Sequence, residues 1–360
     1  MELKTISKSD PQFESYLLGT FSTTHKALPV QTMNVSSEQE SITFQIVSNE
    51  EIRLPDFLSY WAQVLRLRNF VLIAFPIYII IMKATIYHLP YFPLFALLSI
   101  FSAFLLQSSM NLRNDFQDHF WGIDRVQPSS GSRAIQKGWI TAARVKNLSN
   151  YFLIFGIVLA IPMIIVRPIP LIVVGLLSAV LMYTASGGGK FGTQYRFGTE
   201  FSAFWMAGPL LTIGFQIAIG MRLDPEIIML GFVTGGLALF ILYTRSFENI
   251  LFNSQAQIKN TITMLGFERS KKFLSWFWFF WIVLLLFYHF NYASTDWMLM
   301  SFVFVTLASI RVWNSITLLK SPAGSAINRS MKICRRIAWI IVALWFVEYL
   351  TYFVVSEIGN

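Results

Sequence analysis

Long apolar runs separated by short polar segments fill most of the chain after residue 57. A helix needs roughly 17–25 apolar residues to cross a bilayer, and nine runs reach that length. They cover residues 69–88, 92–112, 146–166, 168–185, 197–220, 225–245, 272–291, 295–318 and 335–355. The pattern therefore predicts an all-α fold, a multi-span integral membrane bundle of about nine transmembrane helices. The fourth run is the shortest and begins with two prolines, so its bounds are the least defined.

The first 57 residues have a different pattern, polar and mixed, and divide the chain into an extension (1–57) and a transmembrane domain (58–360). Residues 41–47 alternate between polar and apolar side chains, which is typical of a strand. The extension is thus either a flexible tail or a small folded appendage. Residues 57–68 favour an amphipathic helix lying in the membrane interface, with Arg66 and Arg68 at the lipid headgroups.

Composition supports a membrane protein surrounded by lipid. Of the 360 residues 55% are hydrophobic, and only 13% are charged, whereas soluble domains average roughly 25% charged residues. The net charge of +9 raises the question of nucleic acid, but the basic residues recur in short loops, so we expect no nucleic-acid partner. A single cysteine, Cys334, excludes an internal disulfide framework. The four histidines are scattered, which argues against a histidine metal centre.

The loop charges also predict an orientation. Lys and Arg are concentrated in the loops on the side of the amino terminus, and Arg167 and Arg222 are the exceptions on the other side. Cytoplasmic loops of membrane proteins carry an excess of such residues. We therefore expect a cytoplasmic amino terminus in a bacterial cytoplasmic membrane. The first residues lack an apolar core, so no cleaved secretory signal is expected.

The end of the second run carries a cluster of acids and amides. Asn111, Asn114, Asp115 and Asp118 are three and four residues apart, so on a helix they share one face. Acidic side chains are costly at membrane depth and are rarely placed there without a function. Hard oxygen ligands of this kind suit Mg²⁺ and, through it, a diphosphate. The alternative is a solvated helix end with an asparagine cap.

Cations follow the acids in the next loop. Arg133 and Lys137 lie in a glycine-containing segment after Asp124. Carboxylates that hold a metal, followed by cations, suit a polyphosphate, because the metal bridges its oxygens and the cations take up the remaining charge. Taken singly, the two cations are ordinary cytoplasmic anchors.

These residues carry a resemblance to a known family. The spacing Asn-x-x-Asn-Asp-x-x-Asp-x-x-x-Gly-x-Asp, from Asn111 to Asp124, and Arg-x-x-Gln-x-Gly, from Arg133 to Gly138, resemble the UbiA superfamily of intramembrane prenyltransferases. Within it the chain is most similar to 1,4-dihydroxy-2-naphthoate prenyltransferases of menaquinone biosynthesis. The segments 183–184 and 197–209 resemble that group as well, and the likeness covers roughly residues 57–355.

The resemblance implies an activity, a Mg²⁺-dependent transfer of a prenyl group from an isoprenoid diphosphate to a small aromatic acceptor. For a dihydroxynaphthoate, it implies attack at the carboxyl-bearing carbon with loss of CO₂. The expected catalytic residues are Asn111, Asp115 and Asp118, which are also expected metal ligands. The expected substrate-binding residues are Asn114, Asp124, Arg133, Lys137, Lys259 and Tyr183. Tyr183, Trp205 and Tyr243 are candidates for an aromatic cavity that stabilises an allylic cation.

The second acidic motif of the superfamily is degenerate here. Its usual two aspartates fall on Ile250 and Ser254, although Lys259 and Thr261 stay in register. The nearby oxygen donors that could complete the metal site are Glu248, Asn249 and Asn253. Amides bind Mg²⁺ more weakly than carboxylates do. Either these residues hold the second metal position, or the chain has lost full activity, or the segment is a polar loop without ligands.

Two rival functions remain from the sequence. A non-catalytic relative that binds isoprenoid diphosphates would explain the degenerate motif. A transporter would explain charges within apolar runs, namely Lys83, Arg311 and Glu348. Absence of turnover would distinguish the non-catalytic relative from an enzyme. A cavity lined by all three charges would distinguish the transporter.

Overall fold

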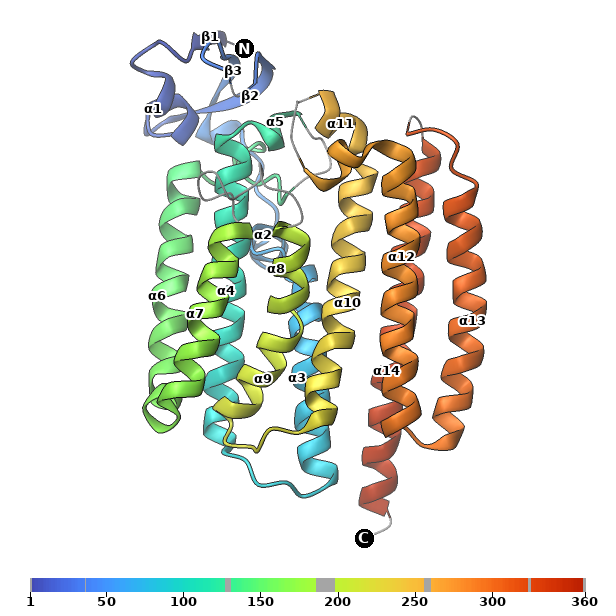
Figure 1. Ribbon diagram of the computed structural model, residues 1–360. Coiled ribbons are helices and arrows are strands. Elements are labelled where there is room, and N and C mark those ends of the chain that lie inside the picture. Colours follow the sequence, from blue (N-terminus) through green and yellow to red (C-terminus); the bar gives the residue numbers. More distant parts are fainter. Residues whose placement is uncertain are drawn as a thin grey trace. The chain divides into compact units, whose positions relative to one another are not determined.

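The computed structural model describes residues 2–35, 37–126, 131–185, 198–255, 260–322 and 325–358 (Figure 1). It is predominantly helical, as the apolar pattern predicts. The chain divides into two compact units. Unit 1 comprises Met1–Phe70, Ser102–Val158 and Phe252–Ile258, and unit 2 comprises Val71–Phe101, Leu159–Leu251 and Lys259–Asn360.

Among the described residues, eight helical segments are long and apolar enough to cross a membrane, and a shorter apolar helix adds to them. The prediction of a multi-span bundle of about nine helices is therefore confirmed. The helices are α3 (Val71–Ile86), α4 (Pro93–Phe120), α6 (Ala142–Val166), α7 (Pro168–Ala185), α8 (Gly198–Met206), α9 (Pro209–Ala218), α10 (Pro225–Glu248), α12 (Thr261–Tyr292), α13 (Thr295–Thr317) and α14 (Ser325–Ile358). Two short helices, α5 (Ile123–Val126) and α11 (Ile250–Gln255), lie at helix ends.

The fifth predicted span is two helices rather than one. A break at Gly208 separates α8 from α9, and Pro209 begins the second helix, where its missing N–H costs nothing. A Cβ atom on Gly208 would collide with backbone atoms of Gly231 and Gly235 on α10. Small residues on both sides thus let the break approach α10 closely, a common way of packing membrane helices.

Helix α12 begins at Thr261, well before residue 272, where the predicted span begins, because a capping box starts the helix there. The side chain of Asn260 accepts a hydrogen bond from the Thr263 backbone, and the Thr263 hydroxyl accepts one from the Asn260 backbone. This reciprocal capping box stabilises a helix start. Gly266, with a φ of 70°, then kinks the helix. The apolar pattern marks only the membrane part of a helix, and the capped polar turns extend it.

Unit 1 begins with a folded segment. Strands β1 (Glu2–Ser7), β3 (Ser41–Ser48) and β2 (His25–Met33) form an antiparallel sheet in that order. The short helix α1 (Phe13–Leu18) packs on one face of the sheet. The buried side chains come from both: Ile6, Phe13, Tyr16, Leu17, Ile42 and Phe44. The alternation at residues 41–47 therefore marks a strand, and the extension contains a folded appendage.

The membrane-interface segment of unit 1 is shorter than predicted. Asp56 caps α2 (Phe57–Val64) by accepting a hydrogen bond from the Ser59 N–H at 3.0 Å. The helix ends before Arg66, whose φ of 56° lies in the left-handed region. Residues other than glycine seldom adopt this conformation. The 3₁₀ helix η2 (Leu67–Phe70) then leads into α3.

Candidate functional site

The last turns of α4 and the turn after them gather three carboxylates in unit 1. Helix α4 continues eight residues past the predicted end of its apolar run, so Asp115 and Asp118 lie on one helical face. Gly122, with a φ of 84°, then reverses the chain into α5, which begins just before Asp124. Asp115 and Asp124 are 2% and 1% exposed. Carboxylates buried this deeply need a cation.

Arg66 supplies that cation. Its guanidinium forms an ion pair with Asp115, and it lies within electrostatic range of Asp118 and Asp124. Burial lowers the pKa of the Arg66 guanidinium, and the charges of these two aspartates oppose that shift. We call Arg66, Asp115, Asp118 and Asp124 the aspartate–arginine cluster. The sequence placed Arg66 at the lipid headgroups, but the left-handed turn after α2 directs its side chain to the cluster instead.

A glycine completes the cluster. Gly131 has a φ of 65°, and a Cβ atom there would lie 2.9 Å from the Arg66 guanidinium, from Asp115 Oδ1 and from Asp124 Oδ2. These three groups therefore surround one backbone position. Next to it, the Ser132 N–H donates to Asp115 Oδ1 at 3.2 Å. The other oxygen of Asp115 is buried without a hydrogen-bond partner in the structure, an unusual state for a carboxylate.

Gly131→Ala is expected to lower the turnover rate of the protein roughly tenfold, if the cluster is its active site. An alanine strains the left-handed backbone by about 1–2 kcal/mol, which corresponds to roughly one factor of ten, and its methyl group would displace the carboxylates. The measurement is the turnover rate of the protein. Gly175→Ala on α7 is the matched control, because a Cβ atom there meets nothing within 4 Å. Equal rates in the two variants would contradict the assigned geometry.

Among the other first-motif residues that the structure describes, Arg133 contacts the cluster. Arg133, also with a positive φ, donates to the backbone oxygen of Asp124 at 2.5 Å. Asn111 donates to the Leu65 carbonyl and accepts from Gln107, so its amide is engaged within the protein. Asn114 is half-buried. Lys137 is exposed, with its ammonium 4.3 Å from the centre of the Trp139 ring.

Comparison with known sequences decides the family. The sequence model of the UbiA prenyltransferase family matches residues 73–352. The chain belongs to the UbiA family. A comparison with curated proteins finds no match.

Solved structures share the UbiA fold of this chain. A digeranylgeranylglyceryl phosphate synthase superposes with a TM-score of 0.57 at 17% identity, covering 82% of this chain and 99% of that one. A UbiA homologue from Archaeoglobus fulgidus, bound to GPP and Mg²⁺, superposes with a TM-score of 0.54 at 14% identity, covering 82% and 98%. The same homologue bound to DMAPP and Mg²⁺ gives 0.53 at 12% identity, covering 79% and 99%. At these identities the likeness concerns the fold.

In the segment that corresponds to the second UbiA motif, several of the candidate oxygen donors are hydrogen-bonded within the protein. In unit 2 the Glu248 carboxylate accepts from Arg335 at 2.7 Å, and the amide nitrogen of Asn249 donates to the Arg245 carbonyl at 3.3 Å. Asn253, in unit 1, is buried. Lys259 lies outside the described residues. A carboxylate that the sequence analysis did not single out, Glu200 on α8, is buried and accepts from the Thr261 hydroxyl.

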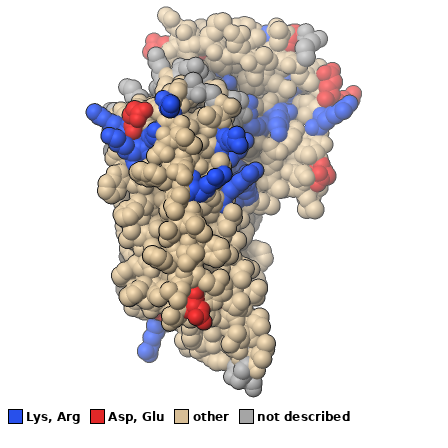
Figure 2. Space-filling view, turned by 90° about the vertical axis from the view of Figure 1, so that its right-hand side faces the viewer, with Lys and Arg blue, Asp and Glu red and all other residues tan. Residues whose placement is uncertain are grey.

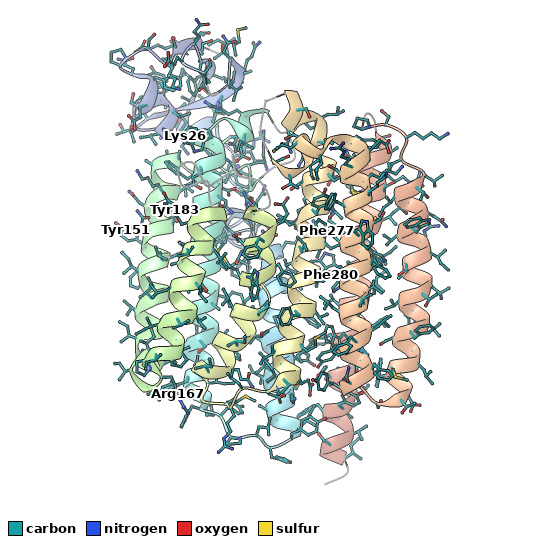
Figure 3. The ribbon with its side chains drawn as sticks, in the orientation of Figure 1. Lys26, Tyr151, Arg167, Tyr183, Phe277 and Phe280 are labelled. Carbon is teal, nitrogen blue, oxygen red and sulfur yellow. The ribbon has the colours of Figure 1, made fainter. Side chains whose placement is uncertain are left out.

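The three aromatic candidates have different surroundings in unit 2. Tyr183 on α7 is 54% exposed (Figure 3). Trp205 belongs to an aromatic group with Phe204 and Phe232. Tyr243 is fully buried against Phe277, with ring centroids 4.8 Å apart. Tyr243 is thus buried and Trp205 half-buried among rings, whereas more than half of the Tyr183 side chain is exposed.

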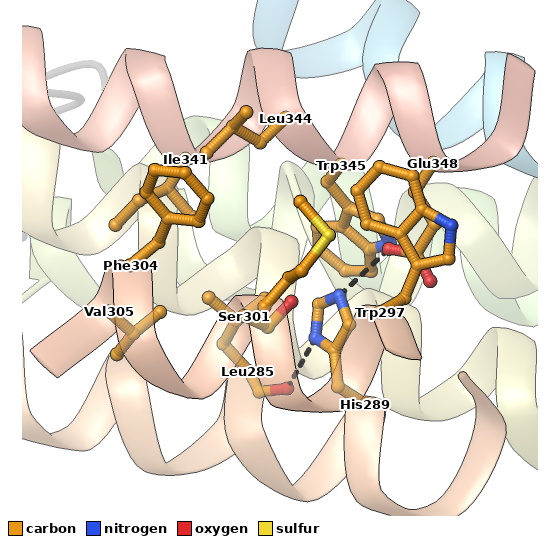
Figure 4. Close-up of a pocket in the computed structure, with 11 residues that line it drawn as sticks. Leu285, His289, Trp297, Ser301, Phe304, Val305, Ile341, Leu344, Trp345 and Glu348 are labelled. Carbon is orange, nitrogen blue, oxygen red and sulfur yellow. Dashed lines mark hydrogen bonds and ion pairs between the residues drawn. The ribbon is translucent and has the colours of Figure 1, made fainter. Parts of the chain in front are cut away.

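The charges that suggested a transporter are paired locally or exposed. Lys83 forms ion pairs with Asp224 and Glu226, and Arg311 is exposed. Glu348 accepts from His289 at 3.0 Å, beside a cavity between α12, α13 and α14 (Figure 4). The volume of that cavity is about 20 Å³, enough for one water molecule. The three charges do not line one path, so the structure gives the transporter function no support.

Proposed function

We propose that this UbiA protein transfers a prenyl group from an isoprenoid diphosphate to an aromatic acceptor, with Mg²⁺ as cofactor. The observation that carries the proposal is the aspartate–arginine cluster, in which three buried or half-buried carboxylates lie near one guanidinium, and two of them, Asp115 and Asp124, lie beside Gly131. Family membership and the solved homologue bound to GPP and Mg²⁺ support it.

The donor set fits Mg²⁺. Among the described residues, no three acidic, histidine or cysteine side chains converge closely enough to hold a metal by themselves. Mg²⁺ is usually bound by one or two carboxylates together with phosphate oxygens and water, so a closed protein cage is not required. Asp115, with its unpartnered buried oxygen, and Asp118 are the proposed ligands. When bound, Mg²⁺ neutralises the diphosphate and makes it a better leaving group.

The protein residues position and stabilise charge. Arg66 lies beside the carboxylates and balances the negative charge that the departing diphosphate carries. Arg133, held against the Asp124 backbone, adds a second guanidinium at this site. The carbon–oxygen bond of the donor breaks, and the electron-rich ring of the acceptor attacks the resulting allylic carbon. The resemblance implies an aromatic cavity that stabilises this cation and excludes water from it, and we propose Trp205 and Tyr243 as candidates for its lining.

We propose 1,4-dihydroxy-2-naphthoate as the acceptor, in quinone biosynthesis. The support is the motif from Asn111 to Gly138, which resembles that group of enzymes. We also propose that the amino terminus is cytoplasmic in a bacterial membrane. Figure 2 shows Lys and Arg side chains gathered over one half of the helical face, while the other half is nearly uncharged. This distribution agrees with the positive-inside rule.

The proposal is tested by mixing the purified protein with Mg²⁺, labelled polyprenyl diphosphate and dihydroxynaphthoate, and by measuring prenylated product. We expect product only when all three components are present and none after chelation of Mg²⁺. Replacing the naphthoate by a 4-hydroxybenzoate tests the acceptor separately. No product with either acceptor would overturn the proposed transfer.

A second function, diphosphate binding without turnover, has one observation in its favour. Glu248, the carboxylate nearest the second motif along the sequence, is already neutralised by Arg335, so it offers little to a second metal ion. Donor binding without product in the assay above would establish that function.

Ser254→Asp tests whether the second motif still works. Ser254 stands where the family usually has an aspartate, and its side chain is exposed in α11. We expect transfer at the wild-type rate or faster, because the carboxylate restores a metal ligand. The measurement is the initial rate at limiting Mg²⁺, with Ser254→Asn as a control of equal size. A lower rate in the aspartate variant alone would mean that the site has been rebuilt around serine.

A further inference from the structure

The folded segment at the amino terminus is attached to the first motif at several points within unit 1. Phe120, two residues after Asp118, packs into the core of the sheet. Val35 contacts Gly122, where a Cβ atom would lie 2.6 Å from its side chain. Lys26 of β2 donates to the Gly138 carbonyl at 2.5 Å (Figure 3). The first two contacts involve the arm of the motif before Gly131 (residues 111–124), and the third involves the arm after it (residues 133–138).

A histidine bridges the segment and the two arms. His119 is 2% exposed, and its Nε2 lies 3.0 Å from the Leu17 carbonyl. Because a carbonyl only accepts, Nε2 carries the proton, and Nδ1 then accepts from the Gln136 amide at 3.3 Å. The neighbour of Asp118 is thereby tied to α1 on one side and to the arm after Gly131 on the other.

The strongest attachment is a buried ion pair. Glu40 and Arg125 have side chains 5% and 1% exposed, and the Arg125 guanidinium donates to Glu40 Oε1 at 2.6 Å. Two further nitrogens of Arg125 are buried without a partner in the structure. Glu40 therefore provides the compensating charge that this guanidinium needs, and burial would be costly without it.

The position of Arg125 links this ion pair to the site. Arg125 follows Asp124 directly, and both lie in α5, a helix of only four residues. A helix this short does not hold its own orientation, so contacts from outside fix the direction of the Asp124 carboxylate. Two charged contacts do so: Glu40 acts through Arg125, and Arg133 acts through the Asp124 carbonyl oxygen. Of the two, Glu40 belongs to the amino-terminal segment.

We infer that Glu40 is a positioning residue, which holds Asp124 in the diphosphate–metal site through Arg125, and that residues 2–51 complete that site. This inference rests on the proposed function. Residues that orient metal ligands from outside typically contribute 10–100-fold to metal affinity or activity. The segment thus acts on binding of the metal and the donor, and the later attack by the acceptor does not depend on it.

The test measures the affinity of the protein for Mn²⁺ by electron paramagnetic resonance, in the presence of a thiolated, unreactive donor analogue. We expect Glu40→Gln to weaken Mn²⁺ binding about tenfold and to raise the KM for Mg²⁺ and donor, while kcat at saturation stays close to wild type. Glu38→Gln removes the same charge from an exposed position on the same loop and should match wild type. The exchanged pair, Glu40→Arg with Arg125→Glu, should recover most of the affinity.

Each other outcome is informative. Mn²⁺ affinity in Glu40→Gln equal to that of Glu38→Gln overturns the inference, as does a lower kcat at unchanged affinity, which would show a merely structural role. If Glu40→Gln does not fold, Glu40→Asp keeps the charge one methylene further away, and wild-type affinity in that folded variant also overturns it. Absence of Mn²⁺ binding in the wild type would instead refute the proposed function.

Discussion

Asp118→Asn is expected to reduce prenyl transfer by at least about 10²-fold, the loss seen when one preorganised charge-stabilising group is removed from an active site. Asparagine has nearly the shape of aspartate, so the helix end should stay intact. The substitution also removes repulsion between Asp118 and Asp124, which lie within electrostatic range of each other. Thermal unfolding should therefore occur at the wild-type temperature or slightly above.

Product formation and thermal unfolding are measured together for this variant. Asp296→Asn, an exposed aspartate in the first turn of α13, is the matched control and should retain wild-type activity. Asp115→Ala should also abolish transfer, but it leaves Arg66 without its partner, so its effect is harder to assign. A wild-type rate in Asp118→Asn would remove the metal-site hypothesis.

Arg66→Ala is expected to lower the free energy of unfolding by about 3 kcal/mol, because it leaves the buried Asp115 carboxylate uncompensated. It should also weaken donor binding. Added Mg²⁺ should restore much of the stability, since a divalent ion takes over the role of the guanidinium. A ligand at a hundred times its Kd stabilises the folded state by about 2.7 kcal/mol. The wild type should gain less, because Arg66 already neutralises the cluster.

The comparison that isolates this effect is Arg68→Ala, which removes an exposed arginine two residues away. Unfolding is followed with and without Mg²⁺ for both variants. Equal stability of the two, or an absent Mg²⁺ response in Arg66→Ala, would show that Arg66 does not serve as the counter-cation of the cluster.

The sequence predicted the helical bundle because each membrane span is a continuous run of apolar residues and can be recognised from that run alone. Runs such as 225–245 need no long-range information, and the structure has α10 at Pro225–Glu248. The shared face of Asp115 and Asp118 followed from helical spacing alone. Helix ends were less accurate where capping side chains add polar turns, as Asn260 does for α12.

The contacts of the cluster were not predictable from patterns along the chain. Arg66 meets Asp115 across 49 residues, after a left-handed residue that no local signal marks. Glu40 meets Arg125 across 85 residues. Arg66 looks like an ordinary interfacial arginine in sequence, and Glu40 like any acid in a polar extension. The fold shows that Glu40 is buried and Arg66 half-buried against the first motif.

The most direct measurement is a high-resolution structure of the protein with Mg²⁺ and a thiolated donor analogue. We predict the metal between the diphosphate oxygens and the carboxylates of Asp115 and Asp118, with Arg66 turned toward the diphosphate. A diphosphate bound away from these aspartates, or aspartate oxygens that face bulk water with no chamber beneath them, would contradict the account.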